Sequence, residues 1–479
     1  MLETLLSWLL HVGAVASITL LIFYVYFKIC YSYWKKHGIP TFKPTVPFGN
    51  FSDSILSGKN PGYEITKLYK AFEGHKVGGL YRFGAPSLLL RDPDVIKDVL
   101  VKHFEHFFSR GRLFDEEAEP LDAHLFALSG SKWKNLRVRM TPLFTTLKMK
   151  MMFWTVVECG KELQNCLQKP ANNGETIEIK DYLARYTTDV ISSCAFGIQC
   201  NCLKNPDAEF RNWGRKIIQP NIRQRVTSML HVVCPSLVYI LKLSLFPKDV
   251  TNYFRTMVRK TVEYREKNNV QRQDFMQLMI QLKNKTLAIE EDEDFLQKEA
   301  DEMKSTTPFE ITMDVIAAQA FVFFIAGFET SSATMTFCLY EMAMQPDIQK
   351  RVRAEINTVL EKHDGNITYE SISEMEYLDK VVSETLRKYP AVVSITRECT
   401  KPIKLRGSDV TVPKGMQVLV PILGLHYDPK YYPDPERFDP ERFSEEEKKK
   451  RPHFCYLPFG EGPRMCIGSV PSFNILKSQ

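Results

Sequence analysis

A continuous apolar stretch in the second half of the chain limits the fold more than any other feature of the sequence. Val315–Phe328 is apolar at every position except Gln319. Thr307, followed by proline and, three residues on, by glutamate, predicts a helix start, and Pro346 predicts its end. The helix over residues 307–345 would be more than about 50 Å long. Its apolar middle has fourteen residues, too few to cross a bilayer, so the helix should run buried through one large domain.

The composition agrees with a single large folded body. Of the 479 residues, 44% are hydrophobic and 25% are charged, which is ordinary for a globular protein. Length alone suggests about three domains, but the buried central helix favours one. The formal net charge of +6 is too small to indicate nucleic-acid binding. Eleven cysteines are too few for a disulfide scaffold.

The N-terminus predicts a membrane anchor. Leu5–Phe27 has 23 residues without a formal charge, and a helix of that length, about 34 Å, would cross a bilayer core. A cleaved signal peptide is the alternative, but it needs a basic start and a shorter apolar core. Lys28 and the lysines after it place the body in the cytosol. We expect an anchor at residues 1–27, a basic and proline-rich linker at 28–50, and a body at 51–479.

Strand signals interrupt the helical pattern in two places. Residues 77–90 predict a hairpin with its turn at Gly84, Ala85 and Pro86. Residues 403–420 contain further strand-like pieces separated by turns. The expected fold class is mainly α with small β-sheets (α+β).

The apolar segment 228–247, which Pro235 and Lys242 interrupt, has two interpretations. It could belong to the core, or it could be a surface that dips into the membrane interface. The sequence leaves both open.

A ten-residue pattern near the end carries the clearest chemical signal. Phe459–Gly468 has the form Phe-x-x-Gly-x-Arg-x-Cys-x-Gly. Glycines on both sides of Cys466 let the backbone approach a bound group closely, and neighbouring N–H groups would stabilise a thiolate. Arg464 can pair with a carboxylate. A lone cysteine is more often a small buried hydrophobic residue, and that is our interpretation of the other ten.

The pattern resembles the haem-binding signature of the cytochromes P450. In that family the cysteine, here Cys466, is the axial thiolate ligand of haem b, and its electron donation favours O–O cleavage. The resemblance covers the chain in order to about residue 468. The segments Phe108–Leu128 and Tyr456–Cys466 are most similar to the insect branch that handles plant toxins and insecticides. The implied fold is the cytochrome P450 fold with an N-terminal transmembrane helix.

The resemblance implies a monooxygenase of the endoplasmic reticulum membrane, with its catalytic domain facing the cytosol. One atom of O2 would enter a hydrophobic xenobiotic or endogenous lipophile, and the other would leave as water. NADPH would supply electrons through NADPH–cytochrome P450 reductase, with cytochrome b5 as a second candidate partner. A basic face that includes Lys132, Lys134 and Arg139 would suit an acidic partner.

An ion-pair arrangement of the family has its counterpart in Glu384 and Arg387, three residues apart on one predicted helix. Such a pair is usually a surface ion pair. In the family it joins an arginine from a Pro-x-Arg-Phe segment, which occurs here around Arg437 and again around Arg442. Spacing to Cys466 favours Arg442. The implied role is structural, because the three side chains would hold the loop that carries the cysteine.

The family's oxygen-activating motif corresponds to Ala326–Thr330 on the long helix. The hydroxyl of Thr330, beside the acid Glu329, would relay protons to bound O2. The alternative is that Thr330 only bonds the carbonyl four residues before it.

Further residues acquire roles from the resemblance alone. Trp133 and Arg137, one helical turn apart, and Arg397 would hold the haem propionates, although a plain surface arginine remains the alternative for Arg397. The complete expected cofactor-binding set is Trp133, Arg137, Arg397, Phe459, Arg464 and Cys466. The expected substrate pocket contains Val322, Ile325, Ala326, Ala391, Val392 and Val393, together with the loop Phe107–Leu128.

The chain departs from the family at its C-terminus. Only 13 residues follow Cys466, and Pro471 would cut short a helix that begins there. We expect a shortened C-terminal region. This leaves, as an alternative, a non-catalytic membrane-anchored relative that cannot hold haem. A haem-thiolate isomerase or dehydratase that needs no reductase is a weaker alternative, because Thr330 serves O2 activation.

Overall fold

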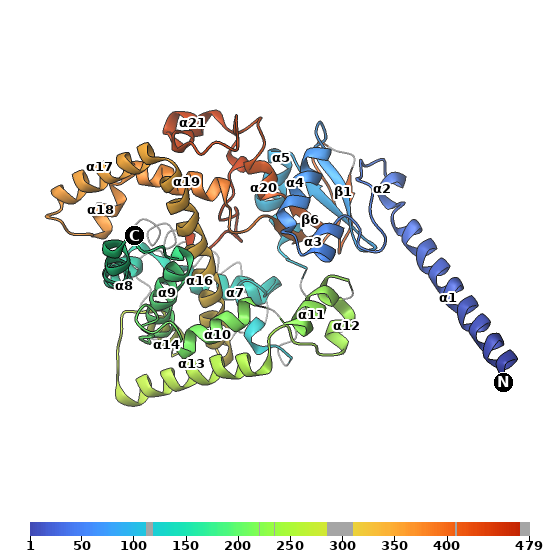
Figure 1. The fold of residues 1–479 in the computed structure, drawn as a ribbon, viewed down its shortest axis with the longest axis horizontal. Coiled ribbons are helices and arrows are strands. Elements are labelled where there is room, and N and C mark those ends of the chain that lie inside the picture. The colour runs from blue at the N-terminus through green and yellow to red at the C-terminus, as the bar shows by residue number, and fades with distance from the viewer. Residues whose placement is uncertain (112–117, 220, 234, 285–309, 408–409, 470–479) are drawn as a thin grey trace.

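The protein is built mainly from helices, with a small sheet at one side (Figure 1). A computed structural model describes residues 1–111, 118–219, 221–233, 235–284, 310–407 and 410–469. The described helices are α1 Leu2–Cys30, α2 Tyr33–Lys36, α3 Ser52–Ser57, α4 Pro61–Ala71, α5 Pro93–Lys97, α6 Phe104–Phe107, α7 Gly130–Met140, α8 Thr146–Asn173, α9 Ile179–Ile191, α10 Glu209–Ile218, α11 Ile222–Val233, α12 Pro235–Ile240, α13 Lys248–Asn268, α14 Phe275–Lys283, α16 Met313–Met344, α17 Pro346–Lys362, α18 Tyr369–Ser373, α19 Glu376–Lys388, α20 Ile422–His426 and α21 Glu445–Lys450. The described strands are β1 Val77–Arg82, β2 Ala85–Leu90, β3 Ile395–Glu398, β4 Ile403–Lys404, β5 Thr411–Val412 and β6 Gln417–Val420. The expected class, mainly α with small β-sheets, is confirmed.

The central helix α16 passes through the middle of the helical part, as its apolar sequence predicts (Figure 1). Half of its most apolar window is buried, which is typical of a core helix. The predicted start at Thr307 lies outside the described residues, and Glu310 is not helical. The helix starts instead after Thr312, whose hydroxyl accepts a hydrogen bond from the N–H of Val315 at 3.3 Å. A second threonine therefore supplies the N-cap.

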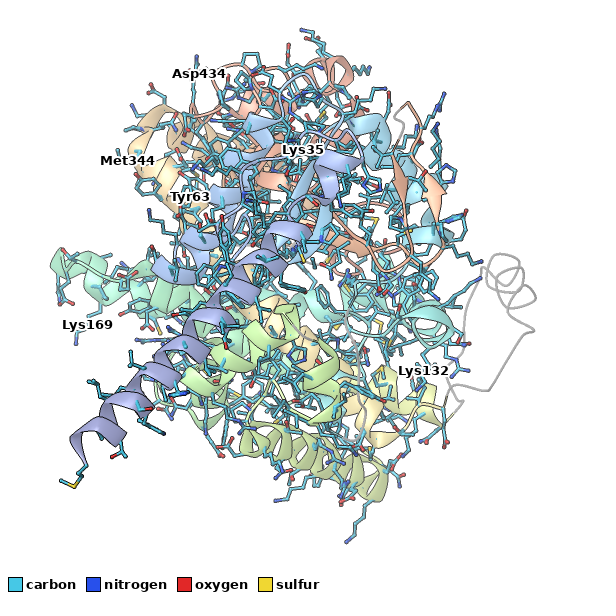
Figure 2. All side chains as sticks on the ribbon, turned by 90° about the vertical axis from the view of Figure 1, so that its right-hand side faces the viewer. Lys35, Tyr63, Lys132, Lys169, Met344 and Asp434 are labelled. Carbon is cyan, nitrogen blue, oxygen red and sulfur yellow. The ribbon has the colours of Figure 1, made fainter. Side chains whose placement is uncertain are left out.

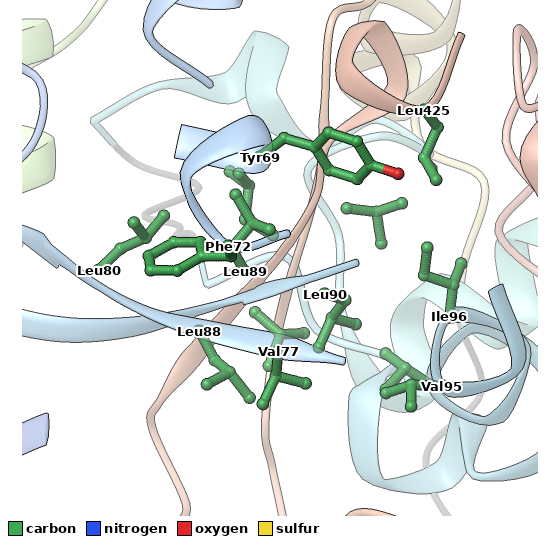
Figure 3. Close-up of a cluster of buried hydrophobic side chains, with 14 of the residues drawn as sticks. Tyr69, Phe72, Val77, Leu80, Leu88, Leu89, Leu90, Val95, Ile96 and Leu425 are labelled. Carbon is green, nitrogen blue, oxygen red and sulfur yellow. The ribbon is translucent and has the colours of Figure 1, made fainter. Parts of the chain in front are cut away.

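The larger sheet joins strands from opposite ends of the body. Its order is β1-β2-β6-β3, with β2 and β6 parallel and the other neighbours antiparallel. Figure 3 shows the cluster of apolar side chains against this sheet, where Tyr69 of α4 and Phe72, directly after α4, lie over residues of β1 and β2. Leu80 and Leu88 in this cluster are fully buried. This core fixes β3, and therefore Arg397, to the N-terminal part of the body.

The hairpin is confirmed, but its turn is shorter than expected. Ala85 and Pro86 belong to β2 and pair with β1, and Phe83 takes a left-handed φ of 51° in the turn. Proline is tolerated in the strand because β6 pairs with β2 only from Ser87 onward.

The first helix extends away from the body (Figures 1 and 2). Thr4–Lys36 is long and apolar enough to cross a membrane, and none of its most apolar window is buried. The short helix α2 that follows it is bonded to the sheet: the indole N–H of Trp34 donates to the carbonyl of Leu80 at 2.9 Å, and the hydroxyl of Tyr81 accepts from the N–H of Trp34 at 3.0 Å. This arrangement fits a membrane anchor that is joined rigidly to the sheet. The domain boundaries at 27 and 50 stay a prediction.

The exposure of side chains on α11 and α12 tests whether segment 228–247 belongs to the core. Ile240 is 72% exposed and Leu241 is 55% exposed, and Met229 and Tyr239 are also exposed, whereas Val238 is buried. The interpretation as core is therefore wrong for most of the described side chains, because the two short helices turn their apolar face outward. A role at the membrane interface stays a prediction.

Candidate functional site

The loop Phe459–Gly468 folds back on itself just before Cys466. The N–H of Cys466 donates to the carbonyl of Phe459 at 2.9 Å. Gly460 and Gly462 take left-handed φ angles of 73° and 76°, which glycine adopts without cost. A Cβ on Gly462 would lie 2.1 Å from the carbonyl oxygen of Leu100. The second glycine of the motif is therefore required for close packing as well as for the turn.

Cys466 differs from the other cysteines that the structure describes. It alone has an exposed side chain; the others are buried or half-buried. Burial of its surroundings nevertheless raises the pKa of the thiol, although the N–H of Gly468 and the charges of Arg137 and Arg110 act to lower it. The side chain of Cys466 is therefore exposed, but protein atoms surround it closely. The positive charges of Arg137 and Arg110 favour a thiolate, but they do not outweigh the cost of removing it from water.

Three arginines lie near this loop with no acidic partner among the described residues. Arg464 and Arg397 are 5% and 3% exposed. One amino group of Arg464 donates to the carbonyl of Leu128 at 2.7 Å, while its Nε and Nη1 are buried and have no hydrogen-bond partner. Arg137 donates to the carbonyl of Met465 at 3.1 Å.

The charges of these arginines affect one another. Burial, together with the neighbouring charges of Arg397 and Arg137, lowers the pKa of Arg464 to about 9. Burial also lowers the pKa of Arg397 to about 10. Trp133 lies under the guanidinium of Arg464, 4.2 Å from ring centroid to guanidinium carbon. Buried guanidinium groups that lack an acidic partner and have unused N–H groups suit a ligand that carries carboxylates. A dicarboxylate such as haem therefore fits this donor set, and Cys466 fits its iron.

Thr330 and Glu329 point in different directions from α16. The hydroxyl of Thr330 donates to the carbonyl of Ala326, which is the helix-internal bond named above as the alternative interpretation. Glu329 forms an ion pair with Lys180 of α9 at 3.0 Å, partly exposed to solvent. Lys180 could not be predicted from the sequence, because the pair joins two helices far apart in the chain.

The six residues expected in the substrate pocket are half-buried or exposed. Val322 and Ile325 are half-buried and Ala326 is exposed on α16. After α19, Ala391 and Val392 are exposed, while Val393 is half-buried against the core of the sheet region. Their role in a substrate pocket stays a prediction.

Glu384, Arg387 and Arg442 come together in the interior. Two N–H groups of Arg387 donate to the carboxylate of Glu384 at 2.6 and 2.8 Å, and both side chains are fully buried. Arg442 lies 3.5 Å from the same carboxylate, whereas Arg437 contributes only its backbone carbonyl, to Arg387. Burial acts to lower the pKa of Arg387, but the hydrogen bonds and charge of Glu384 leave it above its usual value.

His426 extends this cluster toward the cysteine loop and was missed by the sequence analysis. Its Nε2 accepts from the N–H of Leu457 at 3.0 Å, so its Nδ1–H donates to the carbonyl of Arg387 at 3.0 Å. Complete burial lowers the pKa of His426 to about 3. A neutral histidine at the end of α20 has no sequence signal that separates it from a surface histidine.

Comparison with known proteins gives a single result. The family model for cytochrome P450 matches residues 40–470. The chain is 44% identical to cytochrome P450 6k1 of Blattella germanica over 445 residues, which cover 93% of this chain and 84% of the relative. It is 42% identical to probable cytochrome P450 6a14 of Drosophila melanogaster, covering 91% and 85%, and 40% identical to cytochrome P450 6a2 of the same species, covering 94% and 88%. The expected resemblance to the insect branch is confirmed.

These shares of length do not mark the chain as clearly truncated. The expectation of a shortened C-terminal region depends on the residues after Gly468, and residues 470–479 lie outside the described part.

Replacing Glu384 tests the buried ion pair. Glu384→Gln should lower the free energy of unfolding by about 3–5 kcal/mol, because it leaves Arg387 charged and buried without a counter-ion. Chemical denaturation of the full chain measures the change. Glu158→Gln is the control, since its ion pair with Lys161 is half exposed and should contribute less than about 1 kcal/mol. Equal effects would contradict a structural role for the buried pair.

Replacing Gly462 tests the close approach of the cysteine loop to Leu100. Gly174 has a similar φ of 64° but nothing within 4 Å of an added Cβ. Both alanine variants carry about 1–2 kcal/mol of backbone strain, so Gly462→Ala should destabilise by about 1–3 kcal/mol more than Gly174→Ala. Thermal unfolding compares the two. If they lose the same stability, the contact with Leu100 does not constrain the loop.

Proposed function

Because the chain belongs to the cytochrome P450 family, we propose that it is a haem-thiolate monooxygenase that inserts one atom of O2 into hydrophobic small molecules. Electrons would come from NADPH through NADPH–cytochrome P450 reductase, with cytochrome b5 as an additional donor. The substrates are xenobiotics, such as plant toxins or insecticides, or endogenous lipophiles. The apolar helix Thr4–Lys36 supports attachment to the endoplasmic reticulum membrane with the body in the cytosol.

The observation that carries the proposal is the cluster of Arg137, Arg397 and Arg464 beside the Cys466 loop. Its guanidinium groups have no acidic partner among the described residues, and two nitrogen atoms of Arg464, Nε and Nη1, are buried without a hydrogen-bond partner. We assign the three arginines to the haem propionates, with Trp133 supporting Arg464 from below. Phe459 positions the loop through its carbonyl, and Cys466 is the iron ligand.

The chain's own groups would divide the work of the reaction. When haem is bound it supplies the binding and activation of O2, and thiolate ligation favours cleavage of the O–O bond. Arg137 and the N–H of Gly468 act on the sulfur of Cys466 to favour the charged form that ligation requires. The fixed turns at Gly460 and Gly462 hold that sulfur in place without side-chain bulk.

Protons would travel through Glu329 and Thr330. Neighbouring residues on a helix are about 100° apart, so the two side chains have different partners: Glu329 pairs with Lys180, and the half-buried Thr330 bonds the carbonyl of Ala326. Glu329 can exchange protons with water at the surface. The hydroxyl of Thr330, once released from the carbonyl of Ala326, can donate a hydrogen bond to the oxygen that is reduced.

Substrate would lie over the face of α16 that carries Val322, Ile325 and Ala326. The segment Ala391–Val393 after α19 would form a second wall. All of these side chains are apolar, so they bind by excluding water and leave orientation to the shape of the site.

Cys466 provides the first test. The reduced wild-type protein with CO should show the red-shifted Soret band of a thiolate ligand, and Cys466→Ala should lose it, because alanine cannot ligate iron. Cys338→Ala, which removes a buried cysteine from α16, should keep the band. Absorbance spectroscopy of the full chain expressed with haem measures this. A wild type without bound haem would favour the non-catalytic alternative, and a normal imidazole-type band would reject the ligand assignment.

Thr330 provides the second test. Thr330→Val should lower product formed per NADPH consumed by about 10- to 100-fold, since proton delivery contributes on that scale, while NADPH consumption continues. Thr336→Val is the matched control, because Thr336 also bonds only the carbonyl four residues before it, that of Ser332, at 2.7 Å. Product and NADPH are measured in the same reconstituted reaction. Unchanged coupling in Thr330→Val would reject the proton relay.

A further inference from the structure

Gln319 is a buried amide on α16 to which the reaction above assigns no role. It is 0% exposed and stands in an otherwise apolar stretch. An amide buried without partners costs several kcal/mol, typically about 2–7. Its hydrogen bonds therefore indicate why a polar side chain stands here.

Both ends of the amide bond the same distant segment. Its Nε2 donates to the carbonyl of Ala123 at 2.9 Å and, less closely, to the carbonyl of Val315 in its own helix at 3.3 Å. Its Oε1 accepts from the N–H of Leu125 at 3.0 Å. The side chain thus pairs with the backbone of residues 123 and 125 in the way a neighbouring strand would.

We call residues 119–128 the 119–128 segment; only a short turn at Pro120–Asp122 is regular. Its first residue, Glu119, accepts hydrogen bonds from the N–H of Phe246 and the hydroxyl of Thr251, both at 3.2 Å. Its last residue, Leu128, accepts from Arg464 at 2.7 Å. Gln319 supplies the attachment in the middle, between an end fixed to the start of α13 and an end fixed to the cysteine loop.

The position of Gln319 on α16 shows which surface the segment crosses. Positions seven and eleven residues apart on an α-helix lie within about 20° of the same face. Ala326 and Thr330 therefore share the face of Gln319, and Thr330 is about 16 Å further along the helix. The amide is too far from Thr330 to touch the reacting atoms, so it can act only through the segment that it holds.

We propose that Gln319 is a positioning residue that fixes the 119–128 segment across this face of α16 and thereby determines which hydrophobic substrates are accepted. The proposal rests on the monooxygenase function proposed above. Losing the amide leaves the carbonyl of Ala123 and the N–H of Leu125 without their buried partner. The segment then loosens in its middle while Glu119 and Leu128 still hold its ends, and discrimination between large and small apolar substrates weakens.

The first measurement is hydrogen–deuterium exchange of the full chain. Gln319→Met keeps the volume of the side chain and removes its hydrogen bonds. Deuterium uptake should rise about tenfold in rate over the 119–128 segment, as expected for the loss of about one buried hydrogen bond's worth of protection, and stay unchanged elsewhere. Thr188→Val is the matched control, because Thr188 is also fully buried but bonds only Ala184 in its own helix, at 2.7 Å.

The second measurement is substrate discrimination in the reconstituted system. The probes are 7-methoxycoumarin and the larger 7-benzyloxycoumarin, and the ratio of their kcat/KM values should change by roughly tenfold or more in Gln319→Met. The reduced-CO band should keep its wild-type position. Thr188→Val should leave the ratio unchanged.

Unchanged uptake and an unchanged ratio would overturn the proposal, leaving Gln319 a purely structural residue. A wild type without the thiolate band would instead reject the proposed function, while the exchange measurement would still decide whether Gln319 holds the segment. If Gln319→Met does not fold, Gln319→Asn retains an amide one methylene shorter. Gln319→Asn should show the same rise in deuterium uptake over the 119–128 segment. If uptake does not rise, the proposal is equally overturned.

Discussion

The arrangement of the C-terminal half depends on one buried carboxylate, that of Glu384. It receives two hydrogen bonds from Arg387, a third from the N–H of Asp439, and a contact with Arg442. Arg387 in turn donates to the carbonyl of His426 at 2.9 Å, and His426 accepts from Leu457. Because a buried ion is costly unless every partner is in place, α19, α20 and the chain before the cysteine loop can take only this mutual placement. The position of the cysteine loop Phe459–Gly468 therefore depends on the cluster around Glu384.

Two kinds of buried arginine occur in this protein, and they differ in their surroundings. Arg387 has an acidic partner, and the pKa of its guanidinium is raised. Arg397 and Arg464 have none among the described residues, and burial lowers the pKa of each. The first kind serves the fold. The second retains unused hydrogen-bonding capacity, at some cost to the protein alone, which supports the proposal that these arginines bind an acidic ligand. The burial of Arg397 also removes the interpretation that it is a plain surface arginine.

The sequence predicted those features that depend on local spacing. The apolar run of α16 and the hairpin at β1 and β2 both have a short-range pattern. The grouping of Glu384 with Arg387 and Arg442 came from the resemblance to the family, because Arg442 lies far along the chain from the other two. The predicted turn of the hairpin was wrong. The described part of α16 begins after Thr312 rather than at Thr307, because more than one threonine could cap the first N–H groups of the helix. The partners of Glu329 and Gln319 could not be predicted, since Lys180 and Leu125 are brought near only by the complete fold. Gln319 stood out in the apolar run, but the reason for it lies almost 200 residues away.

The joint between α1 and the sheet has a consequence for motion. Trp34 is almost completely buried and bonds both Leu80 and Tyr81, and the hydroxyl of Tyr31 accepts from the N–H of Gly49 at 3.1 Å. These contacts couple the end of α1 to the body. In a bilayer the long axis of α1 would therefore set the tilt of the body, and the viscosity of the lipid, rather than that of the cytosol, would limit how fast the protein turns to meet an electron donor.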